Sequence, residues 1–265
     1  MIPTIRYLGR FVIEYSIWSK GVALLFYKTM YWSIVGPFKG KAAHRQSIFQ
    51  QMVFVGINSI VIVFFVDLFT GIVLGMQSAY LLKKMGAELY ISSLVSISLC
   101  RELSPVLTAL VVAGRAGSAI AAELGTMKVT EQIEALETMA INPIRFLAVP
   151  RFLALVVMLP ALTIVGDLAG IFGGFLVGTR SLNINPDLYM QITFKYLELK
   201  DIYTGLLKAV IFGVIIALVA CYEGLMTKGG AEGVGRATTR SVVISFILII
   251  AADCLVTALF YFINW

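Results

Sequence analysis

Five long apolar runs constrain the fold of this 265-residue chain more than any other feature. A helix needs about 20 apolar residues to cross a bilayer, whereas a membrane barrel would show alternating segments of about ten residues. Only 14% of the residues are charged, against about 25% in soluble domains. The sequence therefore predicts an all-α integral membrane protein. The expected spans are residues 52–82, 90–125, 152–179, 204–226 and 241–263.

Residues 1–45 combine apolar residues at a roughly helical spacing with charges between them. This segment is too charged to cross a bilayer, and its aromatic side chains suit the membrane interface. We expect an amphipathic helix lying on the membrane plane, followed by a single permease domain over residues 46–265. A short external helix is expected at 185–197, because Asn185-Pro186 is a good helix start.

The distribution of Lys and Arg predicts the orientation, because cytoplasmic segments are enriched in these residues. With a cytoplasmic amino terminus, the three inner segments hold seven, four and three of them. The two outer segments then hold two and four, with Lys208 counted among the four. We therefore expect the amino terminus in the cytoplasm and the carboxyl terminus on the opposite side.

Two spans carry ladders of small residues four apart, a spacing that places them on one helix face. The first ladder runs from Ala109 to Gly125 and the second from Gly166 to Gly178. Gly71 and Gly75 indicate a bend or a close helix contact in the first span. We interpret the glycine ladder of the third span as a surface for close helix packing rather than as a ligand site.

A charged pair, Arg101-Glu102, interrupts the second apolar run just before Pro105, where we expect a kink. Charge at bilayer depth is costly and by default marks a functional site. The pair either bridges to a neighbouring span, with Asp253 as a candidate partner, or meets the charged group of a substrate. We favour the second interpretation, because the arginine donor fork suits a phosphate. For Asp67, in the first span, we favour a structural or protonated role.

Residues 130–142 predict a short amphipathic helix on the cytoplasmic side, between the second and third spans. Thr130 is the expected cap, and the early acidic residues suit the positive end of the helix dipole. The segment is either an ordinary loop helix or a helix that docks into a groove of a partner, and we favour docking. The residues expected to dock are Thr130, Glu131, Glu134, Leu136 and Glu137.

The sequence holds no convincing catalytic or metal-binding constellation. It lacks a Walker A loop, a cluster of His, Cys and acidic residues with metal-ligand spacing, and a histidine-based triad. Its three cysteines lie in apolar runs and are expected to be small core residues. We therefore do not expect an enzyme, and a nucleotide site for energised transport would have to lie on another polypeptide.

Several ordered blocks resemble the MlaE family of ABC-transporter permeases, the membrane subunits associated with MCE proteins. The blocks are GIVLGMQ from Gly71, RELSPVLTALVVAGRAGS from Arg101, AELG from Ala122, TEQIEAL from Thr130, Asn142-Pro143, Pro150-Arg151 and RATTR from Arg236. The resemblance covers residues 50–262. Because the blocks agree in order as well as in composition, the resemblance is specific.

The resemblance implies a homodimer that holds a phospholipid in a cavity at its interface and moves lipids between membranes. It implies a separate cytoplasmic ATPase that binds ATP and Mg, with residues 130–142 as the coupling helix, and an MCE-domain protein on the outer side. No cofactor on this chain and no nucleic-acid partner are expected. The implied location is a bacterial inner membrane, with the carboxyl terminus in the periplasm.

The resemblance also assigns individual residues by position. The implied lipid-binding residues are Gln77, Tyr80, Leu81, Arg101 and Glu102. Arg236 and Asp253 fall on polar interface or gating positions. Asp67 departs from the small residue expected in the better-known bacterial members, which leaves the polarity of the cavity floor open.

Two other functions stay open on the sequence. An ion-coupled secondary transporter would use Asp67, Glu102 and Asp253 as proton or cation carriers. A membrane scaffold without transport activity would use the same polar residues only to hold its bundle together.

Overall fold

The computed structural model describes residues 2–38 and 45–262, and within these ranges all regular elements are helices. Five stretches of the described chain are long and apolar enough to cross a membrane. They are Arg45–Lys84, Glu88–Val129, Ile144–Arg180, Leu199–Leu225 and Gly230–Phe262. The predicted all-α membrane architecture is therefore confirmed, and each helical stretch is longer than the apolar run that predicted it.

The elements follow one another along the chain with short connections. The segment before the spans is α1 (Ile2–Phe38), and the first span comprises α2 (Arg45–Val55), the turn Ile57–Ser59 and α3 (Ile60–Lys84). The second span comprises the turn Glu88–Tyr90, α4 (Ile91–Ser98), α5 (Ser104–Val112) and α6 (Ser118–Val129), with π-helical turns at Leu99–Leu103 and Ala113–Gly117. The remaining elements are α7 (Gln132–Thr138), the π-helical turn Ile144–Ala148, α8 (Val149–Arg180), α9 (Pro186–Tyr196), α10 (Leu199–Leu225) and α11 (Gly230–Phe262).

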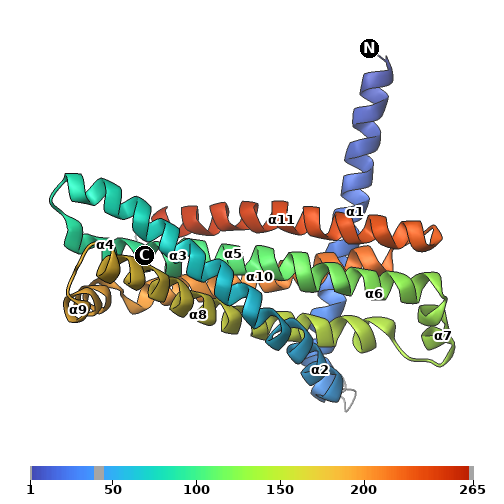
Figure 1. Ribbon diagram of the computed structural model, residues 1–265. Coiled ribbons are helices and arrows are strands. Elements are labelled where there is room, and N and C mark those ends of the chain that lie inside the picture. The colour runs from blue at the N-terminus through green and yellow to red at the C-terminus, as the bar shows by residue number, and fades with distance from the viewer. Residues whose placement is uncertain (1, 39–44, 263–265) are drawn as a thin grey trace.

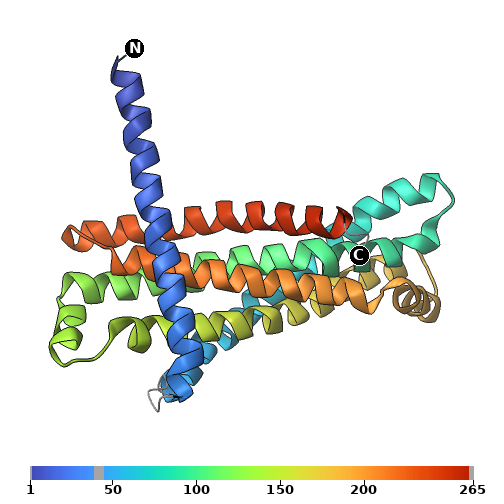
Figure 2. The ribbon, with the colours of Figure 1, turned by 180° about the vertical axis from the view of Figure 1, so that it is seen from behind.

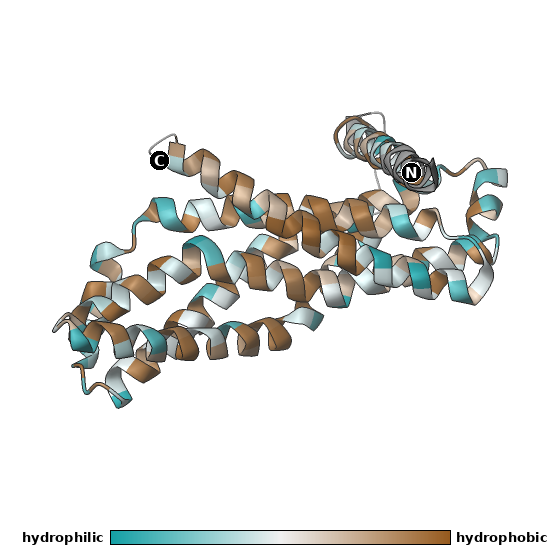
Figure 3. Ribbon diagram, turned by 90° about the horizontal axis from the view of Figure 1, so that it is seen from above, coloured by the Kyte–Doolittle hydropathy of each residue, from teal (hydrophilic) through white to brown (hydrophobic). Residues whose placement is uncertain are grey.

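The spans form one elongated bundle, and α1 lies across it (Figures 1 and 2). α7 and the crossing point of α1 lie toward one end of the bundle, whereas α9 lies at the other end (Figure 1). Hydrophobic residues predominate along the middle of the spans, and hydrophilic residues are most frequent toward the ends (Figure 3). A helix on the membrane plane beside a set of crossing helices would have this arrangement. Residues 39–44 of the expected interfacial segment lie outside the described residues.

The helices α3 and α8 make a close backbone contact. A Cβ atom added to Gly71 would lie 2.0 Å from the carbonyl oxygen of Gly170, and one added to Gly173 would lie 2.3 Å from that of Leu68. Both distances are far below van der Waals contact, so only glycine fits. The close contact expected at Gly71 is therefore confirmed, and the break in helical geometry lies earlier in the span, at residues 56–59.

The ladders of small residues pack against other helices of the same chain. A Cβ atom on Gly178 would lie 2.4 Å from the Tyr189 ring of α9, and one on Gly125 would lie 2.9 Å from Thr227 Oγ1. These distances confirm the interpretation of the ladders as packing surfaces. The short helix expected at 185–197 is present as α9, and it begins where predicted, because the side chain of Asn185 accepts a hydrogen bond from the backbone N–H of Asp187 at 2.9 Å.

The main hydrophobic core lies among α5, α6, α8 and α10, and its fully buried members include Ile120, Leu155, Leu159, Phe212 and Ile216. Coverage differs strongly among the spans. In their most apolar windows, 67% of α10 is buried but only 28% of the first span and 11% of α11. Most of the surface of the first and fifth spans is therefore not covered by other parts of the same chain.

α1 is attached to α10 by an aromatic and a polar contact. The Trp18 ring meets the Tyr222 ring edge-on at a centroid distance of 6.0 Å, and Trp18 Nε1 donates to Glu223 at 2.7 Å. A Cβ atom on Gly21 would lie 2.3 Å from the Tyr222 hydroxyl, so the α1 backbone sits directly on α10. This end of the bundle therefore carries both α1 and α7.

Candidate functional site

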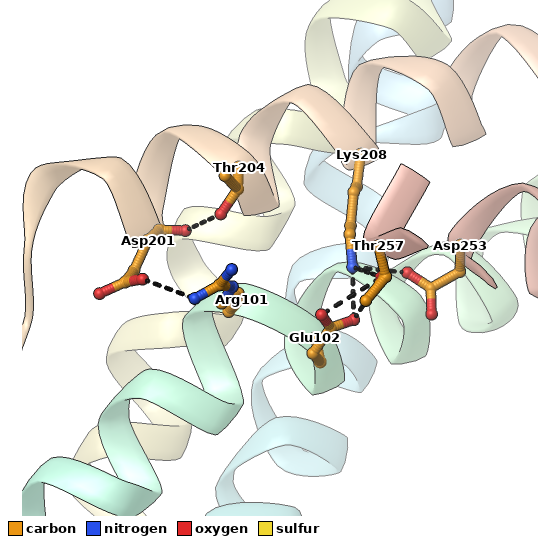
Figure 4. Close-up of polar contacts among 7 residues, drawn as sticks. All are labelled: Arg101, Glu102, Asp201, Thr204, Lys208, Asp253 and Thr257. Carbon is orange, nitrogen blue, oxygen red and sulfur yellow. Dashed lines mark hydrogen bonds and ion pairs between the residues drawn. The ribbon is translucent and has the colours of Figure 1, made fainter. Parts of the chain in front are cut away.

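A π-helical turn within the second span carries Arg101 and Glu102. The turn directly precedes Pro105, so the irregularity expected there takes the form of a widened helical turn that accommodates the missing proline N–H. The backbone of α10 approaches closely, because a Cβ atom on Gly205 would lie 2.0 Å from the carbonyl oxygen of Cys100. This approach places polar residues of α10 beside the charged pair (Figure 4).

Arg101 pairs with Asp201 of α10. Nη1 of Arg101 lies 3.6 Å from Oδ1 of Asp201, and Thr204 Oγ1 donates to the Asp201 carbonyl at 2.8 Å (Figure 4). The Asp201 side chain is 6% exposed, whereas Arg101 keeps 34% of its side chain exposed. Asp253, the candidate partner of the Arg101-Glu102 pair, therefore does not pair with Arg101; it reaches Glu102 through Lys208. A guanidinium has five N–H donors, so one contact at this distance leaves donors for a further group.

Glu102 and Asp253 both bind Lys208, whose side chain is 1% exposed. Lys208 Nζ is ion-paired with Glu102 Oε2, lies 2.8 Å from Asp253 Oδ1 and donates to Thr257 Oγ1 at 2.7 Å (Figure 4). Thr257 Oγ1 in turn lies 3.3 Å from both carboxylate oxygens of Glu102. A buried ammonium is tolerated only when it is paired in this way.

These contacts define a charged cluster that joins three spans: the second, α10 and α11. Its members are Arg101, Glu102, Asp201, Lys208 and Asp253. The prediction that counted Lys208 with the outer loops is wrong, because the residue lies inside the bundle. The signal that could have identified it was a lysine within the fourth apolar run. The cluster is closed around Lys208 and open at Arg101 and Glu102, whose side chains are about one-third exposed.

The other predicted lipid-binding residues lie on α3, on a face that this chain leaves uncovered. Gln77 is exposed, and Tyr80 and Leu81 are 66% and 62% exposed. Tyr80 Oη accepts a hydrogen bond from Lys84 Nζ at 2.8 Å, and the same ammonium lies 4.1 Å from the ring centroid. Within the described residues, no hydrogen bond or ion pair joins these three side chains to Arg101. One chain therefore does not bring the two groups together.

Arg236 lies apart from the charged cluster. It precedes Asp253 on α11 by 17 positions, which corresponds to roughly 26 Å of helix. Its Nη1 lies 3.7 Å from Glu232 Oε1, and it lines a crevice of about 280 Å³ together with Glu223 and Arg240. The two predicted gating residues therefore belong to different parts of the bundle.

The helix α7 covers only Gln132–Thr138 of the predicted 130–142 segment. The prediction that Thr130 caps this helix is wrong, because its hydroxyl donates to the carbonyl of Thr126 at 2.9 Å and thus ends α6. Glu131 is the N-cap residue, in a left-handed conformation with φ of 60° and no side-chain capping bond. The chain turns from α6 into α7 within two residues (Figure 1), and the left-handed conformation of Glu131 permits this turn.

One acidic residue of α7 is fixed by α6. Lys128 Nζ donates to Glu134 Oε1, and this hydrogen bond holds the pKa of Glu134 below its usual value. Leu136 is partly buried against the core and Ile133 is buried in it, whereas Met139 is 69% exposed. The exposed surface of α7 and its flanking residues therefore includes Glu131, Glu137 and Met139.

The chemistry available to the charged cluster is ion pairing and hydrogen-bond donation. Within the described ranges, no group of three or more His, Cys, Asp or Glu side chains is arranged to hold a metal ion. The one-third exposed guanidinium and carboxylate suit a ligand that carries both a negative and a positive or polar group. Such a ligand would have to enter from the surroundings of the bundle.

The fold and the site define a multi-span membrane protein of the transporter-permease class. The chain belongs to the MlaE permease family, because the family model described as Permease MlaE matches residues 48–259. A probable ABC transporter permease protein of Rickettsia typhi is 43% identical over 254 residues, which cover 96% of each chain.

Two further relatives carry more specific names. The intermembrane phospholipid transport system permease protein MlaE of Haemophilus influenzae is 39% identical over 219 residues, covering 82% of this chain and 84% of that protein. The chloroplastic protein TRIGALACTOSYLDIACYLGLYCEROL 1 of Arabidopsis thaliana is 35% identical over 223 residues, covering 84% and 63% of the two chains. The chain is therefore a permease of the ABC-transporter type.

Proposed function

We propose that this chain is the membrane subunit of an ABC-type phospholipid transporter that works as a homodimer. A phospholipid is held at the dimer interface, and a separate cytoplasmic ATPase with bound ATP and Mg drives its movement. An MCE-domain protein receives or delivers the lipid on the outer side. The membrane is a bacterial inner membrane, with the amino terminus in the cytoplasm and the carboxyl terminus in the periplasm. The phospholipid transport name of the Haemophilus influenzae relative supports this cargo.

The observation that carries the proposal is the open side of the charged cluster. Arg101 is held in place by Asp201 but keeps about a third of its side chain exposed, and Glu102 is held by Lys208 with a similar exposure. A fixed guanidinium with free donors can bind a headgroup phosphate. The cluster lies within an apolar bundle, so the rest of the ligand must tolerate apolar surroundings, as acyl chains do.

The uncovered face of α3 supports the dimer interface. Gln77 places a polar side chain on a span of which little is buried. Polar groups inside a bilayer normally face protein or a cavity rather than lipid tails. A second copy packed on this face would cover Gln77 and would enclose a cavity between the two chains, bordered by Tyr80 and Leu81.

The end of the bundle that carries α1 and α7 supports the cytoplasmic assignment. With Lys208 inside the bundle, the outer connections hold fewer basic residues than the sequence count gave them, so the positive-inside bias becomes larger. The outer surface of α7 carries Glu131 and Met139, which combine a charge with an exposed apolar group. These are the properties of a short helix that docks into a groove.

The ion-coupled alternative is weakened by the same contacts. Glu102 and Asp253 are both occupied by Lys208, so neither is a free carboxylate that waits for a cation. Asp67 lies on a different helix and is bonded to Thr108 of α5. The three carboxylates of that hypothesis therefore do not form one site.

Photo-crosslinking tests the lipid site. A photoreactive amino acid at Tyr80 should label phospholipid in membranes that contain the whole transporter. Arg101→Ala should lower this yield several-fold, because the headgroup loses its anchor. The control position is Val157 of α8, which is 51% exposed and should contact bulk lipid equally in both backgrounds. Equal yields at Tyr80 with and without Arg101 would overturn the proposed site.

Co-purification tests the docking surface. The double variant Glu131→Lys and Met139→Asp changes only exposed side chains of the α7 segment and should abolish co-purification of the ATPase subunit. Asp187→Lys, on the first turn of α9 at the opposite end of the bundle, is the matched control and should retain it. Retention by the double variant would place the ATPase elsewhere on the chain.

A further inference from the structure

Two aspartates lie buried where α3 meets α8. Asp67 is 0% exposed and Asp167 is 7% exposed. Within the described part of the chain, neither carboxyl forms an ion pair with a Lys, Arg or His side chain. An ionised carboxylate in a low-dielectric interior costs several kcal/mol unless it is paired, and burial therefore favours the neutral form. The two residues, called the carboxyl pair below, need some source of neutralisation.

Hydroxyl and thiol groups surround the carboxyl pair but do not satisfy it. Thr108 Oγ1 donates to Asp67 Oδ2 at 3.3 Å, and the Ser104 hydroxyl lies near both carboxyls. The Cys100 thiol interacts with Asp167. The remaining oxygen of each carboxyl, Oδ1, is buried and has no hydrogen-bond partner in the structure. Both side chains are more than nine-tenths buried, and Asp67 is fully enclosed.

The number of protons at Ser104 is too small for two carboxylates. A serine hydroxyl has one hydrogen to donate and two lone pairs that accept. Ser104 Oγ also lies 3.4 Å from the carbonyl oxygen of Thr163, a second acceptor for the same hydrogen. Ser104 can therefore bond to both carboxyls only if at least one of them carries a proton and donates it. A proton on a carboxyl supplies the missing donor and removes the charge at once.

The site is shaped by a glycine. A Cβ atom on Gly166 would lie 2.6 Å from Asp67 Oδ2 and 2.7 Å from Ser104 Oγ, so the two polar groups converge on the space that this glycine leaves. Asp167 and Cys100 also line a predominantly apolar cavity of about 390 Å³ between α8, α9 and α10. Asp67 is enclosed, and the cavity gives Asp167 a route for proton exchange.

We propose that Asp67 and Asp167 form a proton-binding site that couples α3 to α8. The bound protons make the contact uncharged, and the uncharged contact permits the close backbone packing of these helices. A metal ion fits less well, because the described residues offer no group of three or more His, Cys, Asp or Glu side chains that could hold one.

The charged and titratable groups around the pair are few. η3, the π-helical turn Leu99–Leu103, contributes the Cys100 thiol, which interacts with Asp167. α10 contributes Asp201, which is held by Arg101, and Lys208, which is held by Glu102 and Asp253. α4 and α5 carry no charged residue. α9 contributes the buried Tyr189 hydroxyl, which lies beside Gly174, two turns along α8.

Loss of the protons has a defined consequence. Two negative charges at the contact would repel each other in a medium of low dielectric constant, and α3 would be driven from α8. α3 carries the uncovered face with Gln77, so the protonation state sets the position of that face. The site is independent of the nature of the cargo, because it concerns only the packing of two helices in one chain.

Infrared spectroscopy of the purified full-length protein in lipid nanodiscs tests the inference directly. At neutral pH, the wild-type protein should show the C=O stretching band of protonated carboxyl groups. The band should lose intensity in Asp67→Asn and in Asp167→Asn. Asp187→Asn, on the exposed end of α9, is the matched control and should leave the band unchanged. Absence of the band at neutral pH, or equal intensity in all variants, would overturn the proposal.

Two further measurements keep the test decisive if an Asn variant fails to fold. Raising the pH should remove the band from the wild-type protein and lower its unfolding temperature over the same pH range. Replacing an organic cation by sodium should leave the band unchanged. Loss of the band with sodium at constant pH would show that the carboxyl pair binds a metal cation, and it would overturn the proposal of a proton-binding site. None of these outcomes depends on lipid crosslinking at Arg101.

Discussion

The charged cluster and the carboxyl pair place ionisable side chains in the same bundle but neutralise them differently. In the cluster, the buried Lys208 ammonium lies between Glu102 and Asp253, so charge meets charge. In the carboxyl pair, the described surroundings of Asp67 and Asp167 provide hydroxyl and thiol groups but no positively charged side chain. Neutralisation by counter-charge keeps polar groups available to a ligand, whereas neutralisation by protons yields an uncharged packing contact.

Exposure follows the same division. Arg101 and Glu102 retain about a third of their side-chain surface, whereas Asp67 retains none. The cluster can exchange one of its partners for a charged group of a ligand without leaving a buried charge alone. The carboxyl pair has no such freedom, because it is enclosed by the α3–α8 contact. A polar residue within an apolar span therefore needs its partners identified before a function is assigned to it.

The largest effect is expected at Lys208. Lys208→Met leaves two carboxylates of the charged cluster without their counter-charge and should lower the free energy of unfolding by about 3–5 kcal/mol. Thermal unfolding of the purified protein in detergent would measure the loss. The triple variant with Glu102→Gln and Asp253→Asn removes the charges together and should recover most of the stability. A single variant as stable as the wild type would contradict neutralisation by counter-charge.

Gly166→Ala should have the next largest effect, and it acts on the carboxyl pair. The added methyl group would enter the space between Asp67 and Ser104, and overpacking of this kind costs about 1–3 kcal/mol. Gly75→Ala is the matched control, since its Cβ would lie 3.3 Å from Val177 Cβ, a looser contact without polar groups. Thermal unfolding would compare the two variants. Equal losses of stability would show that the space between Asp67 and Ser104 tolerates a methyl group as well as an apolar contact does.

The same neutral substitution should act differently in the two regions. Asp253→Asn removes one of the two charges that hold Lys208 and should cost about 1–3 kcal/mol. Asp67→Asn replaces a group that is already uncharged under the proton model and should cost less. The two variants share their chemistry and their change in volume, so the difference in unfolding temperature measures the difference in environment. A greater loss of stability in Asp67→Asn than in Asp253→Asn would contradict a neutral Asp67.

Much of the fold followed from simple periodicity in the sequence. The apolar runs predicted the five spans because a helix must present apolar groups on all sides to cross a bilayer. The ladders predicted close packing, and the contact at Gly71 confirms it. The ends of the helices were predicted less accurately than their positions, because the helices continue past the apolar runs into polar residues. Thus α11 begins at Gly230, within the Gly- and Thr-rich residues 227–239, whose composition suggested either an inner loop or a broken helix entry.

The site was only half predictable. Arg101 and Glu102 stand out because charges are rare in apolar runs, but their partners depend on how separate spans approach one another. The near contact of Gly205 with the second span, which brings Asp201 and Lys208 to the pair, has no local signal. Asp167 was missed for the same reason: its significance lies in its nearness to Asp67, and sequence separation does not reveal that nearness.

The smallest effect concerns a third kind of charge, the ion pair between Lys128 and Glu134 at the end of the bundle. Their side chains are 34% and 45% exposed, so solvent screens the interaction and little stability rests on it. The hydrogen bond from Lys128 holds the pKa of Glu134 below its usual value.

A lowered pKa fixes the sign of the pH dependence. The bond contributes above the usual pKa of a glutamate and is lost as the pH falls through the lowered one. NMR titration of ¹³C-labelled glutamate, assigned with Glu134→Gln, should show a midpoint that rises in Lys128→Gln and stays unchanged in Lys195→Gln on α9. An unchanged midpoint in Lys128→Gln would contradict the pairing. A rise would show that Lys128 of α6 favours the ionised form of Glu134, whereas the proton model makes the carboxyl pair neutral within the same chain.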